Sequence, residues 1–246
     1  VSPHNFTFYY TSSRIKISNF LLKFGIDIRK KLFAEIHENV GGRLTRVVCG
    51  AAAMDPVTAN GMRDLGIYII QGYGLTECAP ICAVNRFEHY RDAAAGLPMP
   101  GMDIAIENPD DEGVGEILVS GDNVMLGYYK NPEATAEVFQ GEYFKTGDLG
   151  FIDKDGFLYI TGRKKNVIVL ANGKNVFPEE TEELLLDADI IKECIVYNKK
   201  NNGKDFLCAK IVYDTDVEEN EDNARKLVEE HIKTVNSKLI RDKQIM

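Results

Sequence analysis

The sequence predicts an α/β fold that passes into an antiparallel β region and ends in a small α+β module. Three observations lead to this prediction. Residues 44–70 show the order strand, helix, strand, which is typical of a parallel unit. From about residue 94, short strand candidates alternate with glycine turns. Past residue 163, strands and helices alternate again over about 80 residues.

The first part of the chain supplies the parallel unit. In residues 14–40 apolar positions recur every three or four residues, which predicts one or two amphipathic helices that end at Gly41-Gly42. Leu44–Cys49 has the composition of a strand. Asp55-Pro56 is typical of a helix start with proline in the first turn, and Ile67–Ile70 predicts the next strand.

The remaining elements are shorter and are separated by turn residues. In the β region we expect a tight turn at Asp153–Gly156 and the strands Met102–Glu107, Gly115–Ser120 and Phe157–Ile160. In the last module we expect the strands Val167–Leu170, Ile195–Tyr197 and Phe206–Tyr213, the helices Glu179–Leu186 and Asn223–Leu239, and turns at Ala171–Gly173 and Asn201–Gly203.

The composition excludes several classes of protein. With 44% hydrophobic and 27% charged residues the chain can bury a core, and its net charge of −9 argues against nucleic acid as a partner. No apolar run approaches the roughly 18 residues that span a bilayer, and the N-terminus lacks a signal-peptide core. The five cysteines and four histidines lack the spacing of a zinc site or a disulfide scaffold. These features favour a reducing cytoplasm, and they leave the oligomeric state open.

The stretch Gln71–Glu77 combines glycines, an aromatic ring, a hydroxyl and a carboxylate in seven positions. It follows a predicted strand, and open α/β sheets bind ligands at the carboxyl ends of their strands. Thr76 could donate to a phosphate oxygen, and Glu77 could hold Mg²⁺. An ordinary glycine-rich turn with a solvated glutamate remains the alternative.

Four further segments hold residues that suit a nucleotide enzyme, and each also has a purely structural interpretation. The small residues of Cys49–Ala53 would let a flat ring or an acyl chain approach the backbone, or would serve packing. In Tyr143–Asp148, Asp148 follows a glycine turn and could accept hydrogen bonds from ribose hydroxyls, or be a turn residue. Arg163, in Thr161–Lys165, could pair with a phosphate or a ribose in a forked geometry.

The fourth segment, Ala171–Glu182, contains a glycine turn that could approach a ligand closely. Its Pro178-Glu179-Glu180 is equally typical of a helix start with acids that favour the helix dipole.

Taken in order, these segments resemble the adenylate-forming superfamily of acyl-CoA synthetases, luciferases and nonribosomal adenylation domains. The resemblance rests on Tyr73–Glu77, Thr146–Asp148 and Gly162–Lys165, and it spans nearly the whole chain. Within the superfamily the sequence looks most like bacterial long-chain fatty acid–CoA ligases. That narrower resemblance rests on the segments Gly115–Gly121, Met125–Tyr129 and Gly173–Glu180.

The resemblance implies a two-step ligase that uses ATP, Mg²⁺, CoA and a fatty acid. Among the residues it assigns, Thr76 contacts phosphate and Glu77 binds the metal as the catalytic pair, and Tyr73 stacks on adenine. Asp148 and Arg163 take the ribose. The remaining nucleotide and acyl pocket is implied to be lined by Gly50, Ala51, Ala52, Gln71, Gly72 and Gly74.

The resemblance also implies a division into two domains. Residues 1–162 would be the end of a large AMP-binding domain, with an α/β portion at 1–93 and a β-rich portion at 94–162. Residues 163–246 would be a truncated, mobile C-terminal domain. Lys165 falls at the family's hinge, and Gly173 and Lys174 would line the tunnel for the CoA pantetheine arm.

The sequence departs from the family pattern in three places. Alanine stands at position 52, where many relatives have proline. The family's phosphate loop, expected before residue 1, and its catalytic lysine, expected beyond Met246, are absent from the sequence. Since losing one preorganised donor costs on the order of 10²–10³ in rate, we expect the isolated chain to be a fragment that cannot adenylate at a useful rate.

The leading hypothesis is therefore part of an AMP-forming long-chain fatty acid–CoA ligase. Two alternatives remain open at this point. One is an acyl-AMP ligase or peptide-synthetase domain that transfers the acyl group to a carrier protein. The other is a non-catalytic nucleotide-binding module in which the polar residues named above are ordinary surface groups.

Overall fold

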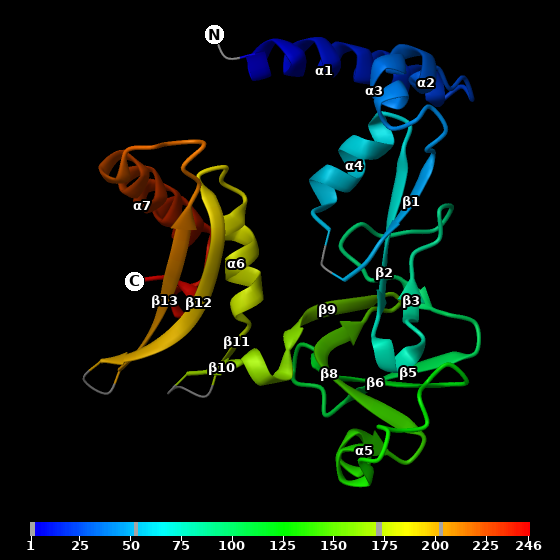
Figure 1. Cartoon of the computed structure of the whole chain (residues 1–246), viewed down its shortest axis with the longest axis vertical. Coiled ribbons are helices and arrows are strands. Elements are labelled where there is room, and N and C mark those ends of the chain that lie inside the picture. The colour runs from blue at the N-terminus through cyan, green and yellow to red at the C-terminus, as the bar shows by residue number, and fades with distance from the viewer. Residues whose placement is uncertain (1–2, 52–53, 171–173, 202–203) are drawn as a thin grey trace. The chain divides into compact units, whose positions relative to one another are not determined.

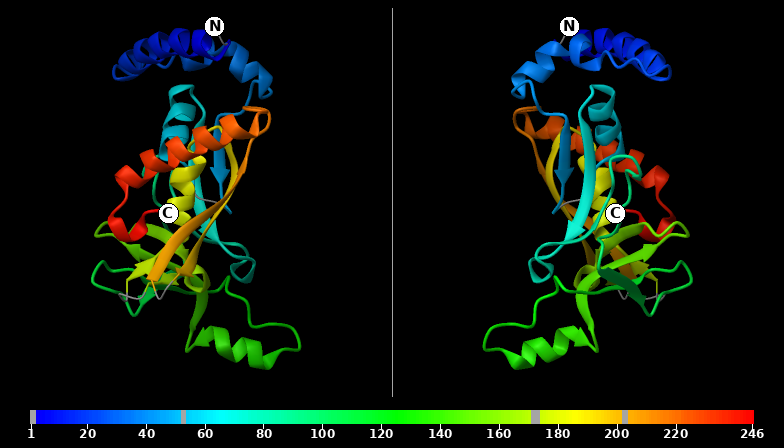
Figure 2. Two further views of the ribbon diagram at one scale, coloured as in Figure 1. Left: turned by 90° about the vertical axis from the view of Figure 1, so that its left-hand side faces the viewer. Right: turned by 90° about the vertical axis from the view of Figure 1, so that its right-hand side faces the viewer.

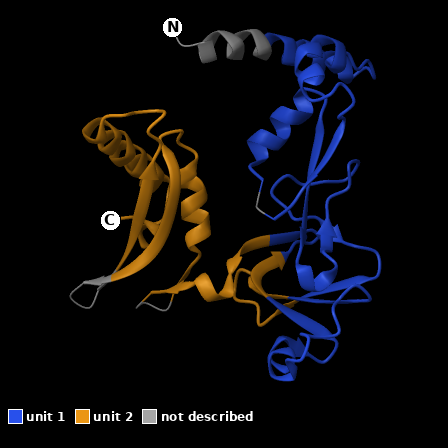
Figure 3. Ribbon diagram, in the orientation of Figure 1, with its two compact units in different colours: residues 1–105, 118–146, 152–159 blue, residues 106–117, 147–151, 160–246 orange. Residues whose placement is uncertain are grey.

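The structure is a computed structural model that describes residues 3–51, 54–170, 174–201 and 204–246 (Figure 1). Two compact units can be distinguished (Figure 3). The first unit comprises residues 1–105, 118–146 and 152–159. The second unit comprises residues 106–117, 147–151 and 160–246.

The first unit contains the predicted parallel unit. Strand β1 (Arg46–Cys49) leads into helix α4 (Pro56–Asp64) and then strand β2 (Tyr68–Gly74), and the two strands pair in parallel with Cys49 opposite Gln71. This confirms the strand–helix–strand prediction. The sheet has the order β1-β2-β3-β4, and β3 (Ile81–Val84) and β4 (Leu97–Pro98) join it in antiparallel pairings.

Helix α4 begins where the sequence predicted. The Asp55 carboxylate accepts hydrogen bonds from the backbone N–H groups of Val57 at 3.0 Å and Thr58 at 2.7 Å, and Pro56 occupies the first helical position. These bonds satisfy donors that have no partner inside the helix. The Thr58 hydroxyl, which also donates to this carboxylate, lowers the pKa of Asp55 most, and the two backbone bonds add to this effect, because all three favour the charged form.

The N-terminal region differs from the prediction of one or two amphipathic helices. It forms three helices, α1 (Pro3–Leu22), α2 (Arg29–Leu32) and α3 (Ala34–Asn39). Two residues of the predicted apolar stripe stay exposed, Ile17 at 57% and Phe24 at 69%. The region is instead anchored by polar groups, because the buried Arg29 guanidinium donates to the Arg63 carbonyl at 2.7 Å.

No helix of the described residues is long and apolar enough to cross a membrane.

The β region forms a five-stranded sheet in the order β5-β6-β8-β7, with β9 paired to β8. The predicted turn after β8 is confirmed by the Gly156 N–H, which donates to the Asp153 carbonyl at 3.0 Å. Strand β8 and the short helix α5 were not predicted. The elements of this region are β5 (Met102–Glu107), β6 (Gly115–Gly121), α5 (Pro132–Val138), β7 (Phe139–Gln140), β8 (Tyr143–Ile152) and β9 (Leu158–Arg163).

The C-terminal part of the second unit is built on a long antiparallel hairpin. Its strands β12 (Ile191–Asn201) and β13 (Lys204–Tyr213) stay paired over their length and twist together (Figure 2). Helices α6 (Pro178–Leu186) and α7 (Glu221–Lys238) pack with this hairpin. The short strands β10 (Ile168–Val169) and β11 (Asn175–Val176) form a separate antiparallel pair.

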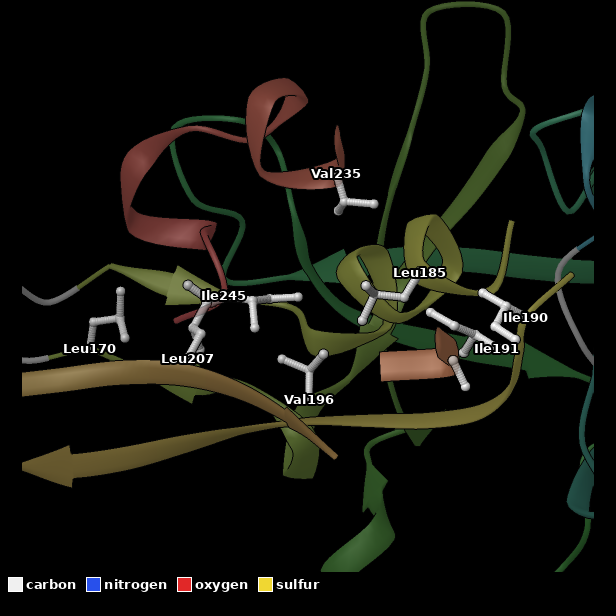
Figure 4. Close-up of a cluster of buried hydrophobic side chains, with 10 residues drawn as sticks. Leu170, Leu185, Ile190, Ile191, Val196, Leu207, Val235 and Ile245 are labelled. Carbon is white, nitrogen blue, oxygen red and sulfur yellow. The ribbon is translucent and has the colours of Figure 1, made fainter. Parts of the chain in front are cut away.

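The hairpin and its helices enclose the core of the second unit. Figure 4 shows Leu185 of α6, Val196 of β12 and Leu207 of β13 directed toward one another, with Val235 of α7 and Ile245 closing the cluster. Leu185 is completely buried and Val235 is 1% exposed. Apolar side chains that alternate along each strand and recur along each helix therefore meet in one layer.

Candidate functional site

The carboxyl ends of β1 and β2 bring the first predicted site residues together. Gly50 follows β1 directly, and a Cβ atom there would lie 3.3 Å from the Gly72 carbonyl oxygen. The Gln71 side chain accepts a hydrogen bond from the backbone N–H of Met54 at 2.7 Å, so it ties the loop after β1 to β2. Ala51 has a positive φ of 72°, and Ala52 lies outside the described residues.

The segment Gln71–Gly74 is not the glycine turn that the sequence suggested. It forms the last half of β2, and its residues pair with β3, with Gly72 opposite Val84 and Gly74 opposite Ile81. Neither glycine has a positive φ. A Cβ atom at Gly74 would lie 1.7 Å from the Pro80 carbonyl oxygen, so glycine is required here for close approach of two backbones and not for turning.

Tyr73 lies in this paired stretch, opposite Ala83, and only 8% of its surface is exposed. Because side chains alternate along a strand, its neighbours Gly72 and Gly74 belong to the opposite face of β2. The aromatic ring is therefore held within the first unit by the fold.

Thr76 and Glu77 are the first polar side chains beyond β2. They belong to a short 3₁₀ helix, η1 (Thr76–Cys78), in which Thr76 is exposed and Glu77 is half-buried. The Tyr128 hydroxyl donates to Glu77 Oε1 at 3.1 Å. This contact was not anticipated, although Tyr128 lies in the Met125–Tyr129 segment that resembles the ligases.

The donor chemistry around Glu77 suits magnesium better than a transition metal. The described residues contain no cluster of three or more histidine, cysteine or acidic side chains that could enclose a metal ion. Mg²⁺ in nucleotide enzymes needs only one or two carboxylates, because water and the substrate phosphates supply its other ligands. A single half-buried carboxylate next to an exposed threonine hydroxyl fits this requirement.

The second unit carries the predicted ribose-binding pair. The Arg163 Nε atom at the end of β9 lies 2.8 Å from Asp148 Oδ1, with the Asp148 side chain 8% exposed and that of Arg163 51% exposed. Asp148 lies inside the ten-residue strand β8 and not after a turn. Gly147 has a positive φ of 72° within the strand, which explains why its sequence looked like turn chemistry.

A buried carboxylate that the sequence did not single out supports this pair. Glu116 of β6 is 7% exposed, accepts a hydrogen bond from the Gly147 N–H at 3.2 Å, and pairs with Lys164 Nζ at 2.5 Å. The Glu116 carboxylate raises the pKa of Lys164, since it favours the charged ammonium. Glu116 therefore holds the backbone next to Asp148 and the residue next to Arg163 in one network.

The predicted hinge and tunnel residues also lie in the second unit. Lys165 is exposed in the 3₁₀ helix η2 (Lys164–Asn166), between β9 and β10. Lys174 Nζ pairs with Asp242 Oδ2 at 2.5 Å, and Asp242 belongs to the 3₁₀ helix η3 (Arg241–Lys243). Gly173 lies outside the described residues.

The predicted residues thus fall into two groups. The group in the first unit runs from Gly50 to Glu77, and the group in the second unit contains Asp148, Arg163, Lys165 and Lys174. Within each group the fold brings residues distant in sequence together, as Gly50 with Gly72 and Asp148 with Arg163.

Known proteins with similar sequences include CoA ligases of long-chain fatty acids. A long-chain-fatty-acid–CoA ligase of Mycobacterium bovis is 38% identical over 183 residues, which cover 74% of this chain and 29% of that protein. A long-chain-fatty-acid–CoA ligase of Salmonella typhimurium is 36% identical over 167 residues, covering 65% of this chain and 28% of that protein. The chain therefore spans less than a third of the length of these relatives.

Solved structures of similar fold are also adenylate-forming enzymes. An anthranilate CoA ligase in complex with anthranoyl-AMP matches with a TM-score of 0.68 at 26% identity, covering 82% of this chain and 40% of that one. The O-succinylbenzoate CoA synthetase of Bacillus subtilis in complex with AMP matches with a TM-score of 0.65 at 28% identity, covering 75% and 40%. These matches confirm the predicted fold class.

The profile of the AMP-binding enzyme family matches residues 4–129, just over half of the chain. The matched region contains the parallel unit, η1 and the Tyr128–Glu77 contact. The chain belongs to the family of AMP-binding enzymes.

Proposed function

We propose that a protein carrying this chain is an ATP-dependent, AMP-forming synthetase that converts a long-chain fatty acid into its CoA thioester. The observation that carries the proposal is the position of Thr76 and Glu77 directly after β2, in a chain 38% identical to a long-chain-fatty-acid–CoA ligase. A related synthetase has been solved with ATP and a magnesium ion.

The reaction takes place in two steps. An oxygen of the fatty acid carboxylate attacks the α-phosphorus of ATP, the bond to the β-phosphate bridge breaks, and acyl-AMP and pyrophosphate form. The CoA thiol then loses its proton and attacks the acyl carbonyl carbon, and AMP leaves with the bonding electron pair. Magnesium, when bound, neutralises charge that builds on the phosphates.

Several residues of this chain have separate roles in nucleotide recognition. In the proposal Glu77 holds the metal, Thr76 donates to a phosphate oxygen and Tyr73 contacts adenine. Asp148 accepts hydrogen bonds from the ribose, and Arg163 orients that carboxylate through the contact at 2.8 Å. Charge-assisted hydrogen bonds of this kind are about twice as strong as neutral ones.

The second half-reaction needs a different surface, and we assign it to residues 163–246 as a mobile domain. Lys165 acts as the hinge, which its exposed position between β9 and β10 supports. Gly173 and Lys174 line the path of the pantetheine arm. The inactivity expected of the isolated chain remains a prediction. A cytoplasmic location agrees with the five cysteines, which form no disulfide.

The proposal is tested by nucleotide binding and by product analysis in a full-length enzyme that contains this chain. We expect Asp148→Asn to weaken AMP binding about tenfold, because a charged acceptor of the ribose is lost. Asp189→Asn, at an exposed position after α6, is the matched control and should leave the AMP dissociation constant unchanged.

Product analysis separates the proposal from its alternatives. We expect mass spectrometry to detect acyl-AMP and then acyl-CoA when a long-chain fatty acid, ATP and CoA are supplied. If the acyl group is transferred only to a phosphopantetheinyl carrier protein, the acceptor is that protein and not CoA, which is the first alternative. If Asp148→Asn leaves the AMP affinity unchanged and no acyl-AMP is detected, the hypothesis that the protein is an adenylate-forming enzyme is rejected.

A further inference from the structure

The loop that carries Glu77 is held from the side by a segment about 50 residues further along the chain. The Asn123 side-chain amide donates to the Cys78 carbonyl at 2.7 Å and to the Ile81 carbonyl at 3.0 Å. The Met125 backbone N–H donates to the Glu77 carbonyl at 2.7 Å. The Tyr128 hydroxyl completes the set by its contact with Glu77 Oε1.

These contacts fix both the backbone and the side chain of Glu77. The loop needs such support, because Ala79 adopts a left-handed conformation with a φ of 51° that L-residues rarely take. Three of the four hydrogen bonds hold backbone carbonyls, and the bond from Tyr128 reaches the carboxylate. Within the part of the chain that the structure describes, the orientation of the Glu77 carboxylate therefore depends on the Tyr128 phenol.

Tyr128 is itself held in place by helix α5. Its backbone N–H donates to the Thr135 hydroxyl oxygen at 2.9 Å, and the Thr135 hydroxyl donates to the Asn131 carbonyl at 2.8 Å. Gly127 has a φ of 147°, and a Cβ atom there would lie 2.7 Å from Thr135 Cγ2. Glycine is thus needed at position 127 to let Tyr128 approach α5.

The protonation state of the phenol suits a donor. The ordinary pKa of a tyrosine hydroxyl is about 10. The hydroxyl therefore keeps its proton at physiological pH and donates it to a negatively charged acceptor. An ionised carboxylate has about four lone-pair positions, so the contact with Tyr128 leaves most of them for another ligand.

We propose that Tyr128 is the positioning residue of the magnesium ligand Glu77. Its hydrogen bond to Oε1 would fix the carboxylate in one orientation and would leave Oε2 and the remaining lone pair of Oε1 for the metal. This inference rests on the proposed function, in which Glu77 binds the metal. Residues that hydrogen-bond to a metal ligand from outside commonly change metal affinity or activity by about 10- to 100-fold when mutated.

The test compares Tyr128→Phe with Tyr129→Phe in a full-length enzyme that contains this chain. Both substitutions remove one hydroxyl, but Tyr129 is 88% exposed and contacts Lys130 through its ring. The first measurement is the dissociation constant of a non-hydrolysable ATP analogue, in excess EDTA and at increasing Mg²⁺ concentrations. The second is Mn²⁺ binding to the complex of enzyme and analogue, followed by electron paramagnetic resonance.

We expect Tyr128→Phe to raise the half-saturating Mg²⁺ concentration about tenfold and to weaken Mn²⁺ binding, with analogue binding in EDTA and the melting temperature unchanged. Tyr129→Phe should match the wild type in every measurement. A wild-type Mg²⁺ response in Tyr128→Phe would overturn the proposal. A lower Mg²⁺ requirement in Tyr128→Phe would also overturn it, because the phenol would then compete with the metal. Loss of analogue binding in EDTA would overturn it as well.

Glu77→Gln distinguishes failure of this inference from failure of the proposed function. If Glu77→Gln abolishes the Mg²⁺ response and Tyr128→Phe does not change it, only the role of Tyr128 is rejected. If Glu77→Gln also leaves the Mg²⁺ response intact, Glu77 is not the metal ligand and both are rejected. In the double variant we expect no effect of Tyr128→Phe beyond that of Glu77→Gln, since both act on one carboxylate.

Discussion

At the scale of single residues, two alanines next to the candidate site adopt left-handed backbone conformations. Ala51, after β1, has a φ of 72° and Ala79, after η1, has a φ of 51°. A left-handed backbone conformation costs a non-glycine residue of order 1 kcal/mol or more, and it occurs where the surrounding structure imposes it. At Ala79 the imposing groups are the Asn123 hydrogen bonds on either side of it.

A second residue-scale property concerns thiol chemistry. Burial, with a smaller effect of the Glu182 carboxylate, raises the pKa of Cys194 to about 11. At pH 8, below this pKa, the thiolate fraction is about 100-fold smaller than for an ordinary cysteine, and only the thiolate is nucleophilic. We therefore expect iodoacetamide to label Cys194 slowly at pH 8 and faster as the pH rises toward 11, as measured by peptide mass spectrometry.

The control for this prediction is the same chain in denaturant, where the environment of Cys194 is lost and labelling should become fast. Equal labelling rates of Cys194 in the folded and unfolded chain at pH 8 would contradict the assigned pKa. The acidic partner acts in the same direction as burial, because a nearby carboxylate disfavours the thiolate.

At the scale of elements, strand β2 shows how pairing overrides local turn chemistry. Gly72 and Gly74 resemble a turn in the sequence, but pairing with β3 extends the strand to Gly74, beyond Gln71 where the pairing with β1 ends. Strand β8 repeats the effect, because Gly147 and Asp148 lie within it. Such pairings join residues distant in the chain, so a local pattern does not reveal them.

Alanine substitutions at Gly74 and Gly61 form a matched pair that tests the strand assignment of this segment. Gly74→Ala places a Cβ atom 1.7 Å from the Pro80 carbonyl oxygen, a backbone atom that cannot rotate away. We expect it to lower the free energy of unfolding by about 1–3 kcal/mol or more, as overpacking does. Chemical denaturation of both variants provides the measurement.

Gly61→Ala is the control, because Gly61 lies inside α4 and a Cβ atom there meets nothing within 4 Å. We expect this change to stabilise the protein by about 0.5–1 kcal/mol, since alanine is the better helix former. If Gly74→Ala proved as harmless as Gly61→Ala, the close approach of β2 to Pro80 would not exist in solution.

At the scale of the whole molecule, each compact unit has buried apolar residues of its own. In the second unit they form the cluster around Leu185. In the first unit Cys82 and Ala83 of β3 are fully buried, and Ile67 is 1% exposed. A defect in one core should therefore act first on the unit that contains it.

Leu185→Ala tests this expectation against its neighbour in α6. Leu185 is completely buried, and its truncation should cost about 2–5 kcal/mol in the second unit. Leu186→Ala, at a position 46% exposed, should have a much smaller effect. Hydrogen exchange measures both: protection should fall in α6, α7, β12 and β13 and persist in β2 and α4. Equal loss of protection in all of these elements would show that the units unfold as one.

The sequence by itself determined the family, the fold class and the start of helix α4. Ordered motifs such as Thr146–Asp148 depend only on residue identity, and the Asp55 cap on groups within three positions, so both are readable along the chain. Only the tertiary structure decided that Gln71–Gly74 is strand, that Glu116 supports Gly147, and that Tyr128 contacts Glu77. These contacts join segments 31 and 51 residues apart, or require pairing between strands, and no local pattern encodes which distant group will meet a given side chain.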